Sequence, residues 1–128
     1  MEISQIAVLG AGQMGNGITQ VAAFAGYQVV MIDVKQDFVD RGLQTIEHSL
    51  AKLVSKERIT QEEADSARSN ISISTDKKAA ADADLVVEAI PEIPELKFST
   101  FEELDNICKP ETILASNTSS ISIDEIAA

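Results

Sequence analysis

Apolar and polar residues follow two different periods in the first quarter of the chain. Residues 3–9 are mostly apolar and predict a short buried strand that leads into a glycine-rich turn. Residues 14–25 carry apolar side chains at helical spacing and predict a helix, which Gly26 ends. Residues 28–32 (QVVMI) predict a second buried strand. Strand, turn, helix and strand in this order form one βαβ unit.

The hydrophobic spacing next predicts a helical hairpin. Residues 37–56 place their apolar side chains on one side of a helix. The sequence TQEE at residues 60–63 is a capping box, and it opens a second helix that we expect to run through Ala67. This hairpin is longer than the usual connection between neighbouring parallel strands.

The remainder of the chain alternates short strands with helices. We expect strands at residues 71–74, 85–90 and 112–116, and helices at 77–83, 92–107 and from 122 onward. Such alternation indicates a parallel sheet covered on both faces. The predicted fold is α/β, a Rossmann-type doubly wound and mostly parallel sheet with a long helical hairpin inserted. We expect residues 1–128 to form one dinucleotide-binding domain, a fragment of a longer enzyme.

Composition narrows the class of protein. Hydrophobic residues make up 45% of the chain and aromatic residues only 4%, which predicts an aliphatic core. No apolar run approaches the roughly 18 residues of a membrane span, and no signal peptide is recognisable. The single cysteine, Cys108, allows no internal disulfide and fits the reducing cytoplasm, where we expect the protein.

The charge of the chain excludes some partners. The formal net charge is -11, so the surface repels a nucleic-acid backbone and an anionic membrane, and we expect neither as a partner. No metal site is expected. A dinucleotide is also an anion, and an acidic domain must therefore hold it through local backbone donors and dipoles.

The glycine-rich turn has the pattern G-x-G-x-x-G between a strand and a helix. Gly10 allows a tight turn, Gly12 lets a pyrophosphate approach the backbone, and Gly15 lets the helix pack closely on the sheet. The helix N-terminus adds backbone N–H groups and roughly half a positive charge. We expect these residues to bind the cofactor: Gly10, Ala11, Gly12, Gln13, Met14 and Gly15.

Asp33 indicates which nicotinamide cofactor is preferred. It follows the second strand, 18 residues after Gly15, where a carboxylate accepts hydrogen bonds from the adenosine ribose. The 2′-phosphate of NADP would meet like-charge repulsion there. Charge-assisted hydrogen bonds to the ribose hydroxyls of NAD contribute roughly 1.5–3 kcal/mol, which corresponds to a preference for NAD above about tenfold. Lys35 softens the repulsion. We therefore predict preference for NAD without absolute exclusion of NADP.

Three stretches together resemble the 3-hydroxyacyl-CoA dehydrogenase family, including the bacterial 3-hydroxybutyryl-CoA dehydrogenases. They are VLGAGQMGNGI at residues 8–18, DLVVEAIPE at 84–92 and ASNTSS at 115–120. The first stretch is shared with many dehydrogenases, whereas the last two in this order are specific. The resemblance implies hydride transfer between NAD and a (3S)-3-hydroxyacyl-CoA, giving a 3-oxoacyl-CoA in fatty-acid or butanoate metabolism.

The resemblance also implies roles for residues outside the glycine-rich turn. It implies cofactor contacts from Glu92, Lys97 and Ser119, a hydrogen bond from Ser119 to the substrate 3-oxygen, and coenzyme A contacts from Ser49 and Lys56. From the residues alone, a solvated helix is the simpler interpretation of Glu92 and Lys97, and a polar turn that of Ser119. Family members often carry Asn where Ile93 stands, so any contact of that amide is lost here.

The general base of this family is missing from the sequence. The family pairs a histidine with an acidic residue in a segment that typically reads HFFNP, and no such segment occurs here. The only histidine, His48, lies in the predicted hairpin, and we do not expect it to be catalytic. The family's helical C-terminal domain, which carries its homodimer interface, is also absent. We expect this chain to bind cofactor without useful turnover.

Two other interpretations remain open from the sequence. One is an enzyme of the 6-phosphogluconate or β-hydroxyacid dehydrogenase group, which shares the G-x-G-x-M-G turn. Its NADP-using members tend to place Asn-Arg after the second strand, where this chain has Asp33 and Val34. The other is a non-enzymatic dinucleotide-binding module that acts as a sensor or structural protein.

Overall fold

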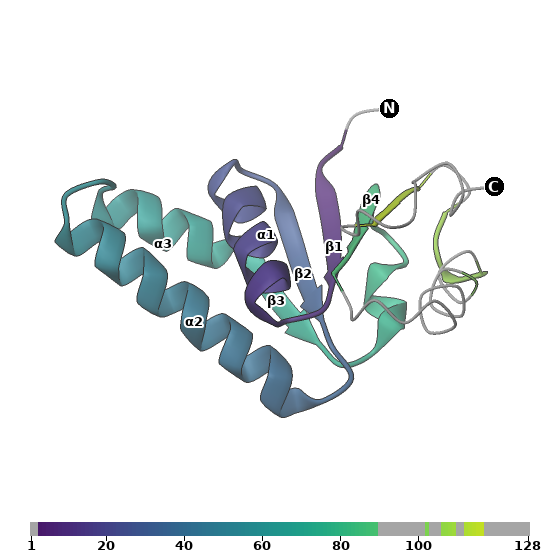
Figure 1. Cartoon of the computed structure of the whole chain (residues 1–128). Helices are drawn as coiled ribbons and strands as arrows, with labels where there is room; N and C mark the ends of the chain where they lie inside the picture. The colour runs from purple at the N-terminus through teal and green to yellow at the C-terminus, as the bar shows by residue number, and fades with distance from the viewer. Residues whose placement is uncertain (1–2, 90–101, 103–105, 110–111, 117–128) are drawn as a thin grey trace.

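The computed structural model describes residues 3–89, 102, 106–109 and 112–116. Figure 1 shows a twisted sheet with helices packed on it. The elements with described bounds are β1 (Gln5–Leu9), α1 (Gln13–Phe24), β2 (Gln28–Ile32), α2 (Gln36–Ser55), α3 (Gln61–Ser69), β3 (Ile71–Ser74), the 3-10 helix η1 (Lys77–Ala80), β4 (Leu85–Glu88) and β5 (Ile113–Ser116).

The five strands form one parallel sheet in the order β3-β2-β1-β4-β5. The chain moves outward from β1 to β3 and then returns to the other side of β1, so the strand order reverses between β1 and β4. At such a reversal, connections leave the carboxyl ends of neighbouring strands in opposite directions, and a crevice opens there. The predicted Rossmann-type topology is confirmed.

Most predicted elements agree with the structure to within one or two residues. The strand expected at 85–90 ends two residues earlier, at Glu88. Among the described elements one differs more, since the helix expected at 77–83 is only the 3-10 helix η1. The helix expected to end at Ala67 continues to Ser69. The helices expected at 92–107 and from 122 onward lie mainly or wholly outside the described residues.

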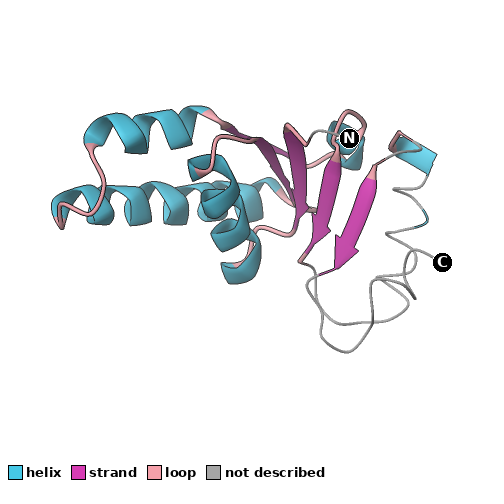
Figure 2. Cartoon of the chain, turned by 90° about the horizontal axis from the view of Figure 1, so that it is seen from above, coloured by secondary structure: helices cyan, strands magenta, loops and turns pink. Residues whose placement is uncertain are grey.

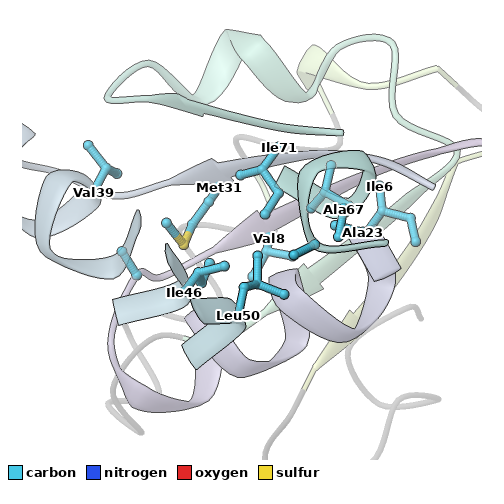
Figure 3. Close-up of a cluster of buried hydrophobic side chains, with 12 residues drawn as sticks. Ile6, Val8, Ala23, Met31, Val39, Ile46, Leu50, Ala67 and Ile71 are labelled. Carbon is cyan, nitrogen blue, oxygen red and sulfur yellow. The ribbon is translucent and has the colours of Figure 1, made fainter. Parts of the chain in front are cut away.

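Helices α1, α2 and α3 gather on one side of the strands (Figure 2). They bury a continuous apolar cluster against the sheet (Figure 3). From α2 this cluster receives Val39, Ile46 and Leu50, which recur at helical spacing and are at most 3% exposed. Met31 of β2 lies beneath them and is fully buried. Amphipathic spacing thus determines which side of α2 meets the sheet.

The other face of the sheet carries a smaller cluster. It contains Ala7, Leu9, Ile32, Ala80, Ala83 and Val86, with Cys108 packed against it. Alternate residues of β1 point to opposite faces, and four of its five residues are buried. A strand buried on both faces reads as a continuous apolar run, which is typical of parallel sheets.

Asp84 joins three separate segments at the amino ends of the strands. Its carboxylate accepts hydrogen bonds from the backbone N–H groups of Ser4 and Gln5, at 3.0 and 3.1 Å, and from the Ser4 hydroxyl. Lys109 forms an ion pair with it at 2.9 Å. The Lys109 ammonium, followed by the two backbone N–H groups, holds the pKa of Asp84 well below its usual range.

None of the helices in the described part of the chain has the length and apolar character that crossing a membrane requires.

Candidate dinucleotide site

The glycine-rich turn lies at the carboxyl end of β1, beside the point where the strand order reverses. Gly10 has a φ of 112°, a left-handed conformation that favours glycine. Its N–H donates to the carbonyl of Ile32 at 2.7 Å, which ties the turn to the end of β2. A Cβ atom on Gly15 would collide with the carbonyl of Gly10. The turn therefore has the close packing that the sequence predicts for its first and third glycines.

The first turn of α1 leaves its backbone donors accessible. Gly12 precedes the helix, and no side chain caps this end. A Cβ atom on Gly12 would have no neighbour within 4 Å, and Gly12, Gln13 and Met14 are exposed. Uncapped N–H groups and the helix dipole favour an anion at this position. The pyrophosphate of a dinucleotide fits this open end of the helix.

Asp33 and the glycine-rich turn are in direct contact. One carboxylate oxygen of Asp33 accepts the N–H of Ala11 at 2.8 Å, and the other accepts the N–H of Val34 at 2.7 Å. Asp33 is half-buried, and each oxygen keeps capacity for a second hydrogen bond. The carboxylate can therefore hold the turn and still accept a ribose hydroxyl. The sequence indicated the second role and missed the first.

Glu88 is a buried carboxyl group at the same edge of the sheet. It is fully buried at the carboxyl end of β4, in register with Leu9 of β1 and Ser116 of β5. The sequence motifs indicate no role for Glu88. The signal in the sequence is a charged residue inside the otherwise apolar run LVVEAI. Glutamate is almost never fully buried without a partner, so a glutamate in a predicted buried strand is unusual.

The predicted coenzyme A contacts lie on the helical hairpin, away from the turn. Ser49 is half-buried on α2, and its hydroxyl accepts a hydrogen bond from Gln20 of α1 at 3.0 Å. Lys56 is exposed and caps the C-terminal end of α2. The structure does not bring these two residues to the dinucleotide site. His48 is exposed on the same helix.

Several predicted site residues lie outside the described residues. They are Glu92, Lys97 and Ser119, together with the Ile93 position that departs from the family pattern. Their roles stay predictions. The structure thus brings together the glycine-rich turn and Asp33, which are the dinucleotide half of the predicted site.

Comparison with known proteins identifies the family of this chain. Residues 5–128 match the family model described as 3-hydroxyacyl-CoA dehydrogenase, NAD binding domain. The chain is 50% identical over 128 residues to a probable 3-hydroxybutyryl-CoA dehydrogenase of Bacillus subtilis, covering all of this chain and 45% of the relative. It is 52% identical over 120 residues to the corresponding protein of Deinococcus radiodurans, covering 94% of this chain and 43% of the relative.

The fold agrees with these sequence matches. The crystal structure of 3-hydroxybutyryl-CoA dehydrogenase from Escherichia coli K12 superposes with a TM-score of 0.96 at 39% identity, covering all of this chain and 27% of that one. The chain spans less than half the length of these relatives. The match over nearly the whole chain favours the acyl-CoA family over the 6-phosphogluconate group. The chain belongs to the 3-hydroxyacyl-CoA dehydrogenase family, as its NAD-binding domain.

Proposed function

We propose that this chain binds NAD(H) in preference to NADP(H) and is the dinucleotide-binding part of a 3-hydroxyacyl-CoA dehydrogenase. The hydrogen bond between Asp33 and Ala11 carries the proposal, because it places a carboxylate directly beside the phosphate-binding turn. When bound, NAD supplies the hydride acceptor for oxidation of a (3S)-3-hydroxyacyl-CoA to a 3-oxoacyl-CoA. The exposed first turn of α1 would hold the pyrophosphate, and Asp33 the adenosine ribose.

The preference for NAD(H) follows from the charge at Asp33. A 2′-phosphate would approach a carboxylate that already accepts two backbone N–H groups, and like charges repel each other. Lys35 is exposed, with its ammonium 5.7 Å from the centroid of the Phe38 ring, and its charge lowers the repulsion only in part. NADPH should therefore bind more weakly than NADH by about tenfold or more.

The acyl-CoA part of the proposal rests on the hairpin and on the family. Lys56 is 14 residues from Gly42, the α2 residue that contacts the turn, and this corresponds to about 20 Å along the helix. Coenzyme A is a long molecule, so contacts this far along α2 from the glycine-rich turn suit its nucleotide end. Ser49 and Lys56 would bind it there, Glu92 and Lys97 would contact the cofactor, and Ser119 would hydrogen-bond the substrate 3-oxygen.

The chain alone should not turn over substrate at a useful rate. Its one histidine is exposed on α2, and loss of a general base typically lowers the rate by roughly 10²–10⁴-fold. We propose that the complete enzyme is a cytoplasmic homodimer. Its dimer interface would lie in the region that the relatives carry beyond the part matched by this chain. A second candidate function is a non-enzymatic dinucleotide-binding module, which would need only the glycine-rich turn and Asp33 that the structure brings together.

Calorimetric titration with NADH and NADPH tests the cofactor assignment. We expect saturable NADH binding and NADPH binding weaker by about tenfold or more. Asp33→Asn keeps an acceptor oxygen for the Ala11 N–H but removes the charge, so the ratio between the two cofactors should fall toward one. Asp37→Ala removes a charge from an exposed residue in the first turn of α2, and it should leave the ratio unchanged.

Different results point to different conclusions. An unchanged ratio in Asp33→Asn would refute the role of Asp33 in cofactor preference. Absence of NADH binding to the wild-type chain would refute the proposed function itself. Titration of the NADH-loaded chain with coenzyme A separates the two candidate functions. Binding that Lys56→Ala weakens would support the dinucleotide-binding part of a dehydrogenase, whereas absence of coenzyme A binding would favour the non-enzymatic module.

A further inference from the structure

Helix α2 packs against the glycine-rich turn at Gly42, a residue without a side chain. Gly42 is buried, and a Cβ atom there would lie 2.7 Å from the carbonyl oxygen of Ala11 and 3.1 Å from its Cβ. The same Cβ would lie 2.9 Å from the Cε of Met31. The terminal methyl of methionine can rotate away, but a backbone carbonyl inside a tight turn cannot move without its peptide plane.

Ala11 is therefore held from two sides. Its N–H donates to Asp33 at 2.8 Å, while its carbonyl and Cβ lie against Gly42. The residue is only 4% exposed, so the peptide planes on either side of it have little room to rotate. The peptide plane that follows Ala11 carries the N–H of Gly12, the residue directly before α1. The contact with α2 therefore lies one peptide plane before the first backbone donors of α1.

We propose that Gly42 is a positioning residue for dinucleotide binding. Its missing side chain lets α2 lie against Ala11, and this contact orients the backbone N–H groups that would face the pyrophosphate. The inference rests on the proposed function, since it assumes that the turn binds the cofactor. The inference adds Gly42 to the proposed dinucleotide site. This residue lies 27 positions after the last glycine of the turn, on a helix outside the pattern G-x-G-x-x-G.

The proposal gives Gly42 a signature that differs from that of Asp33. NADH and NADPH share the same pyrophosphate, so a displaced turn should weaken both by the same factor. A methyl group at position 42 shifts the Ala11 carbonyl, and loss of about one well-formed hydrogen bond corresponds to about tenfold weaker binding. Gly42→Ala should therefore weaken both cofactors by about tenfold and leave their ratio unchanged.

The experiment compares Gly42→Ala with Gly17→Ala in the full 128-residue chain. Gly17 is also a helical glycine, but a Cβ atom there would meet no atom within 4 Å. Each variant is titrated with NADH and with NADPH at a temperature where circular dichroism shows it fully folded. We expect weaker binding of both cofactors to Gly42→Ala and wild-type affinities for Gly17→Ala. Wild-type affinities in a folded Gly42→Ala would overturn the inference.

A second variant covers the case in which Gly42→Ala does not fold. Ala11→Gly removes the Cβ that lies against Gly42 without adding an atom, so it loosens the same contact with no collision. It should weaken NADH and NADPH equally, and unchanged affinities would overturn the inference. A wild-type chain that binds neither cofactor would instead refute the proposed function, and the inference with it. A role limited to stability would lower the melting temperature and leave the affinities of the folded chain unchanged.

Discussion

Gly15 shows how a single missing side chain determines the geometry of the turn. A Cβ atom there would overlap the carbonyl oxygen of Gly10 and lie 2.6 Å from its carbonyl carbon. Neither atom can move freely, because the Gly10 N–H is bonded to Ile32. Gly15→Ala should lower the free energy of unfolding by about 2 kcal/mol or more, as overpacking against rigid backbone does. Urea unfolding followed by circular dichroism measures it.

Gly17→Ala is the matched control at this scale. It makes the same substitution two residues further along α1, where the added methyl meets no atom within 4 Å. Replacing a helical glycine by alanine should then stabilise the chain by about 0.5–1 kcal/mol. If both variants shifted stability in the same direction, close approach of Gly15 to Gly10 would not be the reason for a glycine at that position.

At the scale of elements, the capping box of α3 tests whether a local sequence signal contributes to stability. The Thr60 hydroxyl accepts the N–H of Glu63 at 3.0 Å, and the Glu63 carboxylate accepts the N–H of Thr60 at 2.9 Å. Thr60→Ala should lower the free energy of unfolding by about 1 kcal/mol, since one N–H at the helix start loses its acceptor. Urea unfolding of the whole chain measures this loss.

Thr45→Ala provides the comparison for that substitution. Thr45 is exposed on α2, and its hydroxyl donates only to the carbonyl of Arg41 in its own helix. The same change of side chain there should stay within about 0.5 kcal/mol of wild type. Equal losses for the two threonines would show that the capping geometry of α3 contributes nothing beyond the threonine side chain.

For the whole molecule, Asp84 predicts how stability depends on pH. Its pKa is lowered by the Lys109 ammonium and by the N–H groups of Ser4 and Gln5. The stabilisation is therefore complete above the pKa of an unfolded aspartate, about 3.9, and is lost as the pH falls toward the lower pKa of the folded state. Asp84→Asn should lower the melting temperature at neutral pH, and the difference from wild type should shrink below about pH 4.

Asp82→Asn is the control for the charge change. Asp82 lies two residues before Asp84 and is exposed, so its substitution should leave the melting curve close to wild type across the same pH range. A difference between Asp84→Asn and wild type that stayed constant from neutral to acidic pH would show that the Asp84 charge does not contribute to stability.

Local sequence was sufficient for much of the fold and for locating the glycine-rich turn and Asp33. The bounds of β2 and β3 are predicted to the residue, because short apolar runs between turn residues are local signals. The prediction of the turn and of Asp33 relied on chemistry that one βαβ unit contains. The strand expected at 85–90 was predicted too long, since periodicity alone does not show where pairing with β1 and β5 stops.

The sequence by itself determined the order of strands and helices, the glycine-rich turn, the acidic residue that follows the second strand and the family. Only the tertiary structure decided that Gly42 meets Ala11, that Asp33 also holds the turn, and that Asp84 joins residues 80 positions apart. The physical reason is the range of the interactions. Hydrophobic period specifies which face of a helix is buried, but which atoms touch depends on how that helix is placed along and across the sheet.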